Sequence, residues 1–438
     1  MSVETERTPA RPRRPGDRLA VLGERDFTRF FIGYTTSLLG SSMAPVAVAF
    51  AVLDGSGTGA GTGAATGAGP GSGSGTDLGW VMAARILPVV LVLLAGGVVA
   101  DRLGSRRLML GTDVLRGLVQ ALFAALLAAG HAPVWAMVVL VAVWGIGEGL
   151  FMPAFGAIVP DLVRRKELLA DGNTLLGLSR SVSTVAGPAL AGLVTATSGP
   201  AAVLLIDAVT YGVGALALAG LRLPDRPRAA GGDSMLRELR SGWSEFTARP
   251  WLWITTAQMG LFNLLVWAPF LVLGPLTAQR ELGGARAWGL VMGVYGAGAV
   301  LGGLLMLGRR PGRPLAVATV AGLAWALPSA ALAAGAGLPW VVAGALVAGA
   351  GSAVCGTLFG TTTQRWVPAE LLGRLTSFGA LGAFVLGPLG LAAAGPLADR
   401  FGTGRVLLLG AVWQVAAGVV VLGVPAVRNR RWEEGPGD

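Results

Sequence analysis

Four charged side chains stand inside long apolar stretches of this sequence, namely Arg85, Glu148, Arg180 and Asp207. Ionisable groups within apolar spans are energetically costly, and they commonly mark ion pairs, proton relays or ligand sites. A carboxylate in this setting can carry a proton, whereas an arginine stays charged and needs a partner. The four residues therefore predict proton transfer or charge compensation.

The other reactive side chains do not form a catalytic set. The only histidine, His131, falls in a predicted turn, and the only cysteine, Cys355, lies inside an apolar run. They offer no nucleophile beside a base and no group of metal ligands. We therefore expect no enzymatic activity, no metal site, no cofactor and no intrachain disulfide.

The composition indicates that lipid surrounds most of the chain. Of the 438 residues, 53% are hydrophobic and only 13% are charged, whereas soluble domains carry about 25% charged residues. The net charge of +10 could suggest a nucleic-acid partner. The basic residues instead form small groups between apolar runs, which argues against nucleic acid and favours a lipid bilayer.

Twelve segments are long and apolar enough to cross a bilayer, which takes about 20 residues. The runs are long and do not alternate, so α-helices are predicted rather than barrel strands. The predicted fold is an all-α membrane protein with twelve transmembrane helices in two six-helix halves. The predicted spans are 27–53, 78–100, 108–130, 135–158, 172–198, 200–222, 251–277, 287–308, 315–335, 340–363, 374–397 and 404–424.

The distribution of arginine predicts the orientation, because basic residues gather in cytoplasmic loops. With the N-terminus in the cytoplasm, most of the 34 basic residues lie on the cytoplasmic side. Asp113 and Arg116, near the inner end of the third span, are interpreted as snorkelling side chains. We therefore expect a multi-pass protein of the cell (inner or cytoplasmic) membrane with both termini in the cytoplasm. The basic residues predicted outside are Arg280, Arg286, Arg400 and Arg405.

The loops divide the chain into its expected parts. Residues 54–77 are rich in glycine, alanine, serine and threonine, which predicts a flexible outer loop. The sequence MLRELRSGWSEF has amphipathic helical spacing and is expected to lie along the membrane surface. The expected parts are a tail 1–26, a first half 27–222, a cytoplasmic linker 223–250, a second half 251–424 and a tail 425–438.

The turn after the second predicted span carries a motif. Residues 97–107 read GVVADRLGSRR, which resembles the signature G-x-L-A-D-R-x-G-R-[KR]-[KR] of the major facilitator superfamily. Val99 and Ser105 depart from that signature. The resemblance implies a conformational-switch loop, whose residues here are Gly97, Asp101, Arg102, Gly104, Arg106 and Arg107.

Residues 160–193 and 367–402 resemble the drug-exporter branch of that superfamily, which includes macrolide-efflux and enterobactin-exporter proteins. Residues 187–192 read GPALAG, similar to the antiporter motif G-P-x-x-G-G. The resemblance implies a hinge motif in the fifth span, formed by Gly187, Pro188 and Gly192. A second Asp-Arg element at 395–402 falls on the outer side in the predicted topology. It is interpreted as a degenerate copy of the loop motif in the second half, and the alternative is a misplaced span in that half.

Depth along the spans suggests how the four intramembrane charges pair. At about 1.5 Å per residue, Arg85 and Asp207 each lie roughly 10 Å below the outer surface. Glu148 and Arg180 also share a similar depth. We predict the pairs Arg85–Asp207 and Glu148–Arg180, which either neutralise charge or make Glu148 and Asp207 carriers of the coupling proton.

The same resemblance implies that spans one, four, seven and ten line the transport pathway. In this sequence they offer mostly aromatic and neutral polar side chains. Such a wall suits a bulky amphipathic ligand better than a sugar or a phosphate. The candidate lining residues are Tyr34, Ser37, Ser41, Trp144, Asn263, Trp267 and Thr357.

Together these features predict a secondary transporter that exports a lipophilic or amphipathic small molecule, such as a drug, a natural product or a siderophore. Proton antiport and alternating access would drive it. Its expected partners are the small-molecule substrate, protons and the bilayer, and it is expected to be a monomer. A nutrient importer or uniporter of the same fold is the alternative. A transport-dead membrane receptor fits less well, because the sequence lacks a large soluble region.

Overall fold

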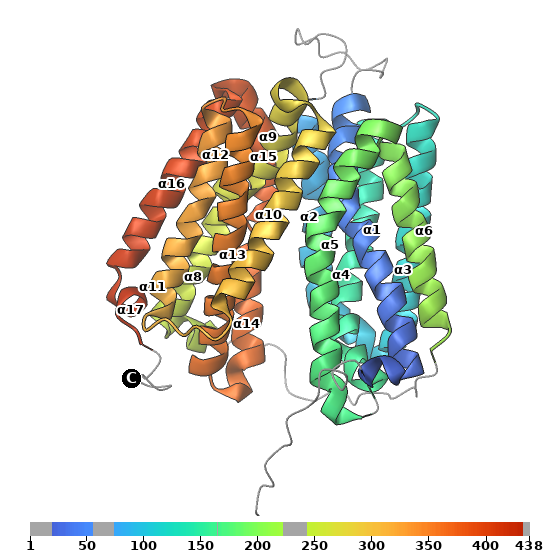
Figure 1. Ribbon diagram of the computed structural model, residues 1–438, viewed down its shortest axis with the longest axis horizontal. Helices are drawn as coiled ribbons and strands as arrows, with labels where there is room; N and C mark the ends of the chain where they lie inside the picture. The colour runs from blue at the N-terminus through green and yellow to red at the C-terminus, as the bar shows by residue number, and fades with distance from the viewer. Residues whose placement is uncertain (1–19, 56–73, 164, 222–242, 432–438) are drawn as a thin grey trace, which may run out of the picture.

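The computed structural model describes residues 20–55, 74–163, 165–221 and 243–431. Within these ranges every regular element is a helix, and the helices stand side by side in two groups (Figure 1). The predicted all-α fold is therefore confirmed. Most of the predicted outer loop and linker falls outside the described residues, although 243–247 of the linker are helical.

The first half contains six long helices joined by short connections. Gly199, with φ of 80°, separates the fifth helix from the sixth, and Pro200 is the first residue of the sixth. Glycine adopts this φ without strain, and proline lacks an N–H that a helix start leaves unused. The predicted break at this point is confirmed. The helices are α1 (Arg25–Gly55), α2 (Gly75–Leu103), α3 (Ser105–Ala128), α4 (Val134–Leu162), α5 (Leu169–Ser198, preceded by η2, Lys166–Leu168) and α6 (Pro200–Ala219).

Three of the six spans in the second half are built from more than one helical segment. Two π-helical turns, η3 and η4, interrupt the first span, and a 3-10 turn, η5, interrupts the third. The fifth span is divided between α14 and α15. The segments are α8 (Pro250–Phe262), η3 (Asn263–Trp267), α9 (Ala268–Thr277), η4 (Ala278–Leu282), α10 (Ala285–Met306), α11 (Pro314–Gly322), η5 (Leu323–Trp325), α12 (Ala326–Ala333), α13 (Leu338–Trp366), α14 (Ala369–Phe384), α15 (Gly387–Phe401), α16 (Thr403–Gly423) and α17 (Pro425–Arg428).

Eleven helical stretches among the described residues are long and apolar enough to cross a membrane. Helix α5 has 30 residues but does not belong to that set, since Arg180 and many serine and threonine residues make it more polar. It nevertheless lies inside the bundle, packed on α1 and α6 of its own half and on α10 of the other. It is the twelfth helix, and the prediction of two six-helix halves is confirmed.

The bundle has two ends, which we call the Asp54 end, where α1 ends and α2 begins, and the Gly104 end, where α2 ends and α3 begins. The Asp54 end is at the top of Figure 1. The Asp-Arg element at 395–402 lies at the Asp54 end, because Thr76 Oγ1 donates to Asp399 Oδ2 at 2.9 Å. It is thus on the side opposite the Gly104 turn, as the predicted topology has it.

The two halves meet along α2 with α15 and along α5 with α10. Glycine permits this approach, since a Cβ at Gly192 would lie 2.6 Å from the Ala285 carbonyl oxygen and 2.8 Å from Gly289 Cα. Near the Asp54 end, Gln279 Nε2 also donates to Asp54 Oδ1 at 3.2 Å. The largest buried apolar cluster accordingly contains side chains of both halves, such as Phe50 and Phe270.

A side chain at Gly192 is expected to separate the halves at the Asp54 end. Overpacking of a close interface costs about 1–3 kcal/mol, so Gly192→Val should lower the population of this arrangement about tenfold. The readout is the rate of disulfide formation between Thr76→Cys and Asp399→Cys in a Cys355→Ser background. Gly177→Val on the same helix is the matched control, because a Cβ there has no neighbour within 4 Å. Equal rates for both valine variants would contradict the expectation.

Candidate functional site

A cavity of about 350 Å³ lies between the two halves, and we call it the central cavity. Helices α1, α2 and α5 line it from the first half, and η3, α9, α10 and α15 line it from the second. Its wall is mainly apolar and aromatic, and its charged residue is Arg85. The larger side chains of the wall include Met82, Ile86, Trp267, Leu271, Trp288, Met292 and Tyr295.

Arg85 forms an ion pair with Glu148 of α4. Arg85 Nη2 lies 2.9 Å from Glu148 Oε2 and 3.2 Å from Oε1, so it donates to both carboxylate oxygens. The guanidinium carbon also lies 4.3 Å from the centre of the Trp144 ring, at cation–π distance. The predicted pairing of Arg85 with Asp207 and of Glu148 with Arg180 is therefore wrong. Depth gives the height of a residue on its helix but not the direction in which its side chain points.

Asp113 and Arg116 form a second ion pair inside the first half. They lie one turn apart on α3, and Arg116 Nη2 donates to Asp113 Oδ1. Only 2% and 5% of their surfaces are exposed, so the interpretation as snorkelling residues is wrong. The Arg116 guanidinium lies 4.4 Å from the ring centre of Phe151 and 4.5 Å from that of Tyr211. The aromatic rings cover the arginine on the faces that carry no hydrogen-bond donors.

Asp207 of α6 is fully buried and pairs with neutral groups. Its Oδ2 accepts a hydrogen bond from Gln120 Nε2 at 2.8 Å, and its Oδ1 lies 3.4 Å from Thr210 Oγ1. Amide and hydroxyl partners satisfy the carboxyl oxygens without supplying an opposite charge. Asp207 thus has a different environment from the two carboxyl groups that face arginines.

The Tyr211 hydroxyl connects these groups across three helices. It accepts hydrogen bonds from Trp144 Nε1 of α4 at 2.9 Å and from Ser41 Oγ of α1 at 2.8 Å. Trp144 and Tyr211 in turn lie against Arg85 and Arg116. The result is one assembly, which we call the charged cluster, of three carboxyl groups and two guanidinium groups. Its members are Arg85, Asp113, Arg116, Glu148 and Asp207.

Arg180 stands apart from the charged cluster. Its Nη2 donates to the Tyr34 hydroxyl at 3.3 Å, and its guanidinium carbon lies 5.9 Å from the Phe155 ring centre. Tyr34 stacks on Phe155 with ring centres 4.6 Å apart. Arg180 is therefore held by an aromatic group on α1 and α4 rather than by a carboxylate.

Of the seven candidate lining residues, the structure places Trp267 in the wall of the central cavity. Tyr34 and Ser37 line a small pocket beside Asp113. Asn263 is buried and donates to the Ala383 carbonyl oxygen at 3.1 Å. The other three lie elsewhere: Ser41 and Trp144 bind Tyr211, and Thr357 lines a pocket near Arg309 and Arg365.

The predicted switch loop forms the tight turn between α2 and α3. Gly104 has φ of 82°, which favours glycine. Arg106 donates from Nε to the Leu218 carbonyl oxygen at 2.9 Å and from Nη2 to the Ala219 carbonyl oxygen at 2.7 Å. An arginine at these free carbonyl groups stabilises the end of α6. Arg107 is exposed in the first turn of α3. The side chains of Asp101 and Arg102 and the surroundings of Gly97 lie outside the described part.

The predicted hinge motif of α5 serves close helix packing in this structure. A Cβ at Gly187 would lie 2.4 Å from Ser42 Cβ of α1, within the first half. Gly192 contacts α10 of the second half, and Pro188 lines the central cavity. The motif therefore positions α5 against both of its neighbours and beside the cavity.

Comparison with known proteins agrees with this geometry. Residues 27–391 match the family model "Major Facilitator Superfamily". The chain is 28% identical over 359 residues to "Multidrug efflux pump Tap" of Mycobacterium tuberculosis, covering 80% of this chain and 85% of that protein. It is 22% identical over 411 residues to "Macrolide efflux protein A" of Streptococcus pyogenes, covering 92% of this chain and 96% of that protein.

The fold is also similar to solved transporter structures. The crystal structure of the nucleoside transporter NupG superposes with a TM-score of 0.67 at 14% identity, covering 90% of this chain and 98% of that one. The resemblance predicted from the sequence is confirmed by these matches. The family model covers most of the chain, so the chain belongs to the Major Facilitator Superfamily and is a multi-pass membrane transporter rather than an enzyme.

Proposed function

We propose that this transporter exports lipophilic or amphipathic small molecules in exchange for protons. The observation that carries the proposal is the Arg85–Glu148 pair, because Arg85 forms part of the central cavity wall. A proton on Glu148 removes the charge that holds Arg85. Proton binding and the electrostatic state of the cavity are thereby linked, which is the requirement for coupling two ligands.

The shape and lining of the central cavity support the proposed substrate class. A volume of about 350 Å³ falls in the range of sites for drug-sized molecules. Its aromatic and aliphatic side chains bind apolar surface, while Arg85, Ser42 and Thr184 supply a few polar contacts. Two relatives that match most of the chain carry the names of a multidrug and a macrolide efflux protein, and these names support the same class.

Glu148 is the proposed proton carrier, and Asp207 is the second candidate. Glu148 keeps 32% of its side chain exposed, whereas Asp207 is fully buried. The partial exposure of Glu148 and its bond to Arg85 of the cavity wall favour Glu148 as the group that exchanges a proton. Asp207 stays a candidate because the charged cluster holds one carboxyl group more than it holds guanidinium groups.

For the orientation, we propose that the Gly104 end and both termini face the cytoplasm. The arginine-rich turn at residues 104–107 supports this, since basic loops stay on the cytoplasmic side. The halves meet at the Asp54 end, which suits a state that receives substrate from the cytoplasm. A monomer that rocks its halves, 27–222 and 251–424, about the central cavity and joins them by the linker 223–250 would complete the cycle.

A reconstituted transport assay tests the proposal. Purified protein in liposomes receives an imposed pH gradient, and the uptake of a radiolabelled macrolide is followed. We expect accumulation that depends on the gradient and disappears when a protonophore is added. Liposomes without protein are the control. Accumulation that is unchanged by the protonophore would contradict the proposed proton coupling.

A further inference from the structure

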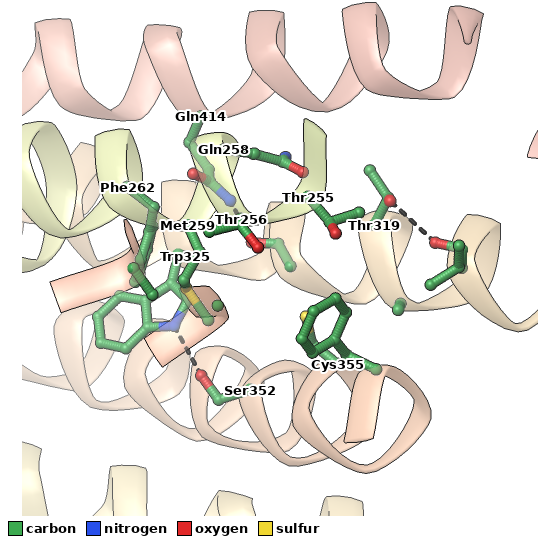
Figure 2. Close-up of a pocket in the computed structure, with 16 residues that line it drawn as sticks. Thr255, Thr256, Gln258, Met259, Phe262, Thr319, Trp325, Ser352, Cys355 and Gln414 are labelled. Atoms are coloured by element: carbon green, nitrogen blue, oxygen red, sulfur yellow. Dashed lines mark hydrogen bonds between the residues drawn. The ribbon is translucent and has the colours of Figure 1, made fainter. Parts of the chain in front are cut away.

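A separate pocket of about 110 Å³ lies inside the second half, and we call it the second-half pocket. It lies between α8, α11, α13, α14 and α16, and the residues that line it are all uncharged. Figure 2 shows Thr256, Gln258 and Gln414 on one side of the pocket and Trp325, Ser352 and Cys355 on the other. It shares no lining residue with the central cavity.

Two buried polar atoms of this pocket have no hydrogen-bond partner among the described residues. Gln414, which is 4% exposed, donates from Nε2 to the Gly322 carbonyl oxygen at 2.7 Å, and its Oε1 is left unpaired. The hydroxyl of Thr256, which is 5% exposed, is unpaired as well. Unpaired buried polar atoms are costly, so a bound molecule that pairs with them would be stabilised.

Thr256 differs in this respect from the other threonines of the same pocket. Thr255 donates to the Trp251 carbonyl oxygen at 2.7 Å, and Thr319 donates to the Leu315 carbonyl oxygen at 2.8 Å. Such a bond to the preceding turn is the usual way for a threonine to satisfy its hydroxyl within an apolar helix. The Thr256 hydroxyl does not make it and remains available to a ligand.

Aromatic side chains separate the second-half pocket from the central cavity. The Trp325 ring belongs to the pocket wall, and its centre lies 4.8 Å from that of Trp267 and 5.1 Å from that of Tyr295. Both of these residues line the central cavity. Ser352 accepts from Trp325 Nε1 at 2.7 Å. A molecule in the pocket would therefore lie against Trp325, whose ring packs on two residues of the central cavity wall.

The first half fills the equivalent space with charge. Helices α1, α3, α4 and α6 have the same order in their half as α8, α11, α13 and α16 have in theirs. Between the former lie Asp113 and Arg116, and the pocket that Asp113 lines there is only about 10 Å³. The second half keeps amide, hydroxyl and indole groups there instead, and these recognise a neutral molecule.

We propose that the second-half pocket is a binding site for a small uncharged aromatic molecule that carries one N–H or O–H donor. Gln414 Oε1 accepts the donor, and where that donor is a hydroxyl group, its oxygen also accepts a hydrogen bond from the Thr256 hydroxyl. Phe262, Met259 and Trp325 cover the ring. A bound ring contacts Trp325, which packs against Trp267 and Tyr295 of the central cavity wall. Binding of the molecule to the pocket requires no transport step.

Alkylation of the native cysteine measures how much of the second-half pocket is occupied. Cys355 is the only cysteine of the chain, and it lines the pocket. The rate of its alkylation by N-ethylmaleimide is measured in the purified full-length protein, with indole or with indene as the probe. Indene has the shape of indole but lacks the N–H donor. We expect saturable protection by indole at concentrations about fivefold lower than by indene, which corresponds to one neutral hydrogen bond.

Two substitutions test whether protection of Cys355 depends on the two unpaired polar atoms, Gln414 Oε1 and the Thr256 hydroxyl oxygen. Gln414→Leu is expected to weaken protection by indole about fivefold and to leave protection by indene unchanged. Thr256→Val should weaken protection by phenol, whose oxygen accepts from the Thr256 hydroxyl, and leave protection by indole unchanged, because indole has no acceptor. Thr277→Val is the matched control, because Thr277 is equally buried but donates to the Leu273 carbonyl oxygen at 2.8 Å outside the pocket.

Three results would overturn the proposal. The first is equal protection by indole and indene in the wild-type protein, which needs no variant and so no assumption about folding. The second is protection by indole that Gln414→Leu leaves intact. The third is a Cys355 that reacts only after denaturation, which would mean a closed pocket. Since no transport is measured, these results are distinct from a failure of proton coupling.

Discussion

Replacing Glu148 with glutamine is expected to abolish proton-driven transport while leaving a folded protein. Glutamine has the shape of the acid but does not exchange a proton in the physiological range, and Arg85 loses its charged partner. Arg85 keeps an amide oxygen as an acceptor, which preserves its position. In the liposome assay, we expect the initial rate of uptake driven by a pH gradient to fall more than about tenfold, because proton coupling is a difference in protonation free energy between states.

The matched control is another glutamate in an ion pair. Glu245 Oε2 lies 2.7 Å from Arg249 Nη1, in the linker just before the second half and away from the charged cluster. Glu245→Gln should transport at the rate of the wild-type protein. If Glu148→Gln retained gradient-driven uptake at that same rate, Glu148 would not be the proton carrier, and Asp207→Asn would become the next variant to measure.

Replacing Arg116 with methionine is expected to cause the largest loss of stability among single substitutions in the first half. The change leaves Asp113 as a buried carboxylate without its partner, 2% exposed. Removing one member of a buried ion pair costs about 3–5 kcal/mol. The measurement is thermal unfolding of the purified protein in detergent, followed by the intrinsic fluorescence of its tryptophans.

A double substitution separates the charge from the packing. Asp113→Asn combined with Arg116→Met removes both charges, so it should regain part of the stability lost by Arg116→Met alone. Arg309→Met is the control for loss of an arginine, because Arg309 is exposed and, within the described part of the chain, donates to the Leu305 carbonyl oxygen rather than to a carboxylate. A double variant as unstable as Arg116→Met would show that arginine packing, not the unpaired carboxylate, determines the effect.

The sequence predicts the fold well because the bilayer leaves few alternatives. Length and hydropathy alone identify the helices, and a glycine followed by a proline identifies the break between α5 and α6. What they do not identify is how each span in the second half is built. Length and hydropathy do not reveal the π-helical turns η3 and η4, although Pro269, the second residue after η3, is a local signal, because proline has no N–H to continue the α-helical hydrogen bonds.

The charged residues were found from the sequence, but their partners were not. Depth places Arg85 near Asp207, whereas the structure pairs it with Glu148 because α2 and α4 pack face to face. The pair of Asp113 and Arg116 was missed as a buried group. Its spacing of three residues on one helix face was the available signal, since such residues are neighbours and readily form an ion pair.

The residues lining the cavity were predicted from the order of the spans along the chain. For this reason, most of the observed lining residues were missed. Among the residues that the structure describes, two of the four spans predicted to line the pathway, four and ten, contribute no residue to the wall of the central cavity, whereas α2, α5, α10 and α15 do. A helix also lines a cavity with only one of its faces, so the spacing of residues matters as well. Trp288, Met292 and Tyr295 of α10 follow helical spacing and share the wall of the central cavity. Combined with their size, that spacing would have identified them.

All five members of the charged cluster belong to one continuous stretch of chain, α2 to α6, while the second half contributes neutral aromatic and amide groups to its own pocket and to the central cavity. In the proposed mechanism, the groups that exchange protons therefore lie in the first half, whereas both halves line the central cavity that binds the ligand. A chimera that joins residues 20–221 of this chain to the second half of a homologue is expected to keep the proposed proton-binding groups and to change the part of the cavity wall that the second half supplies.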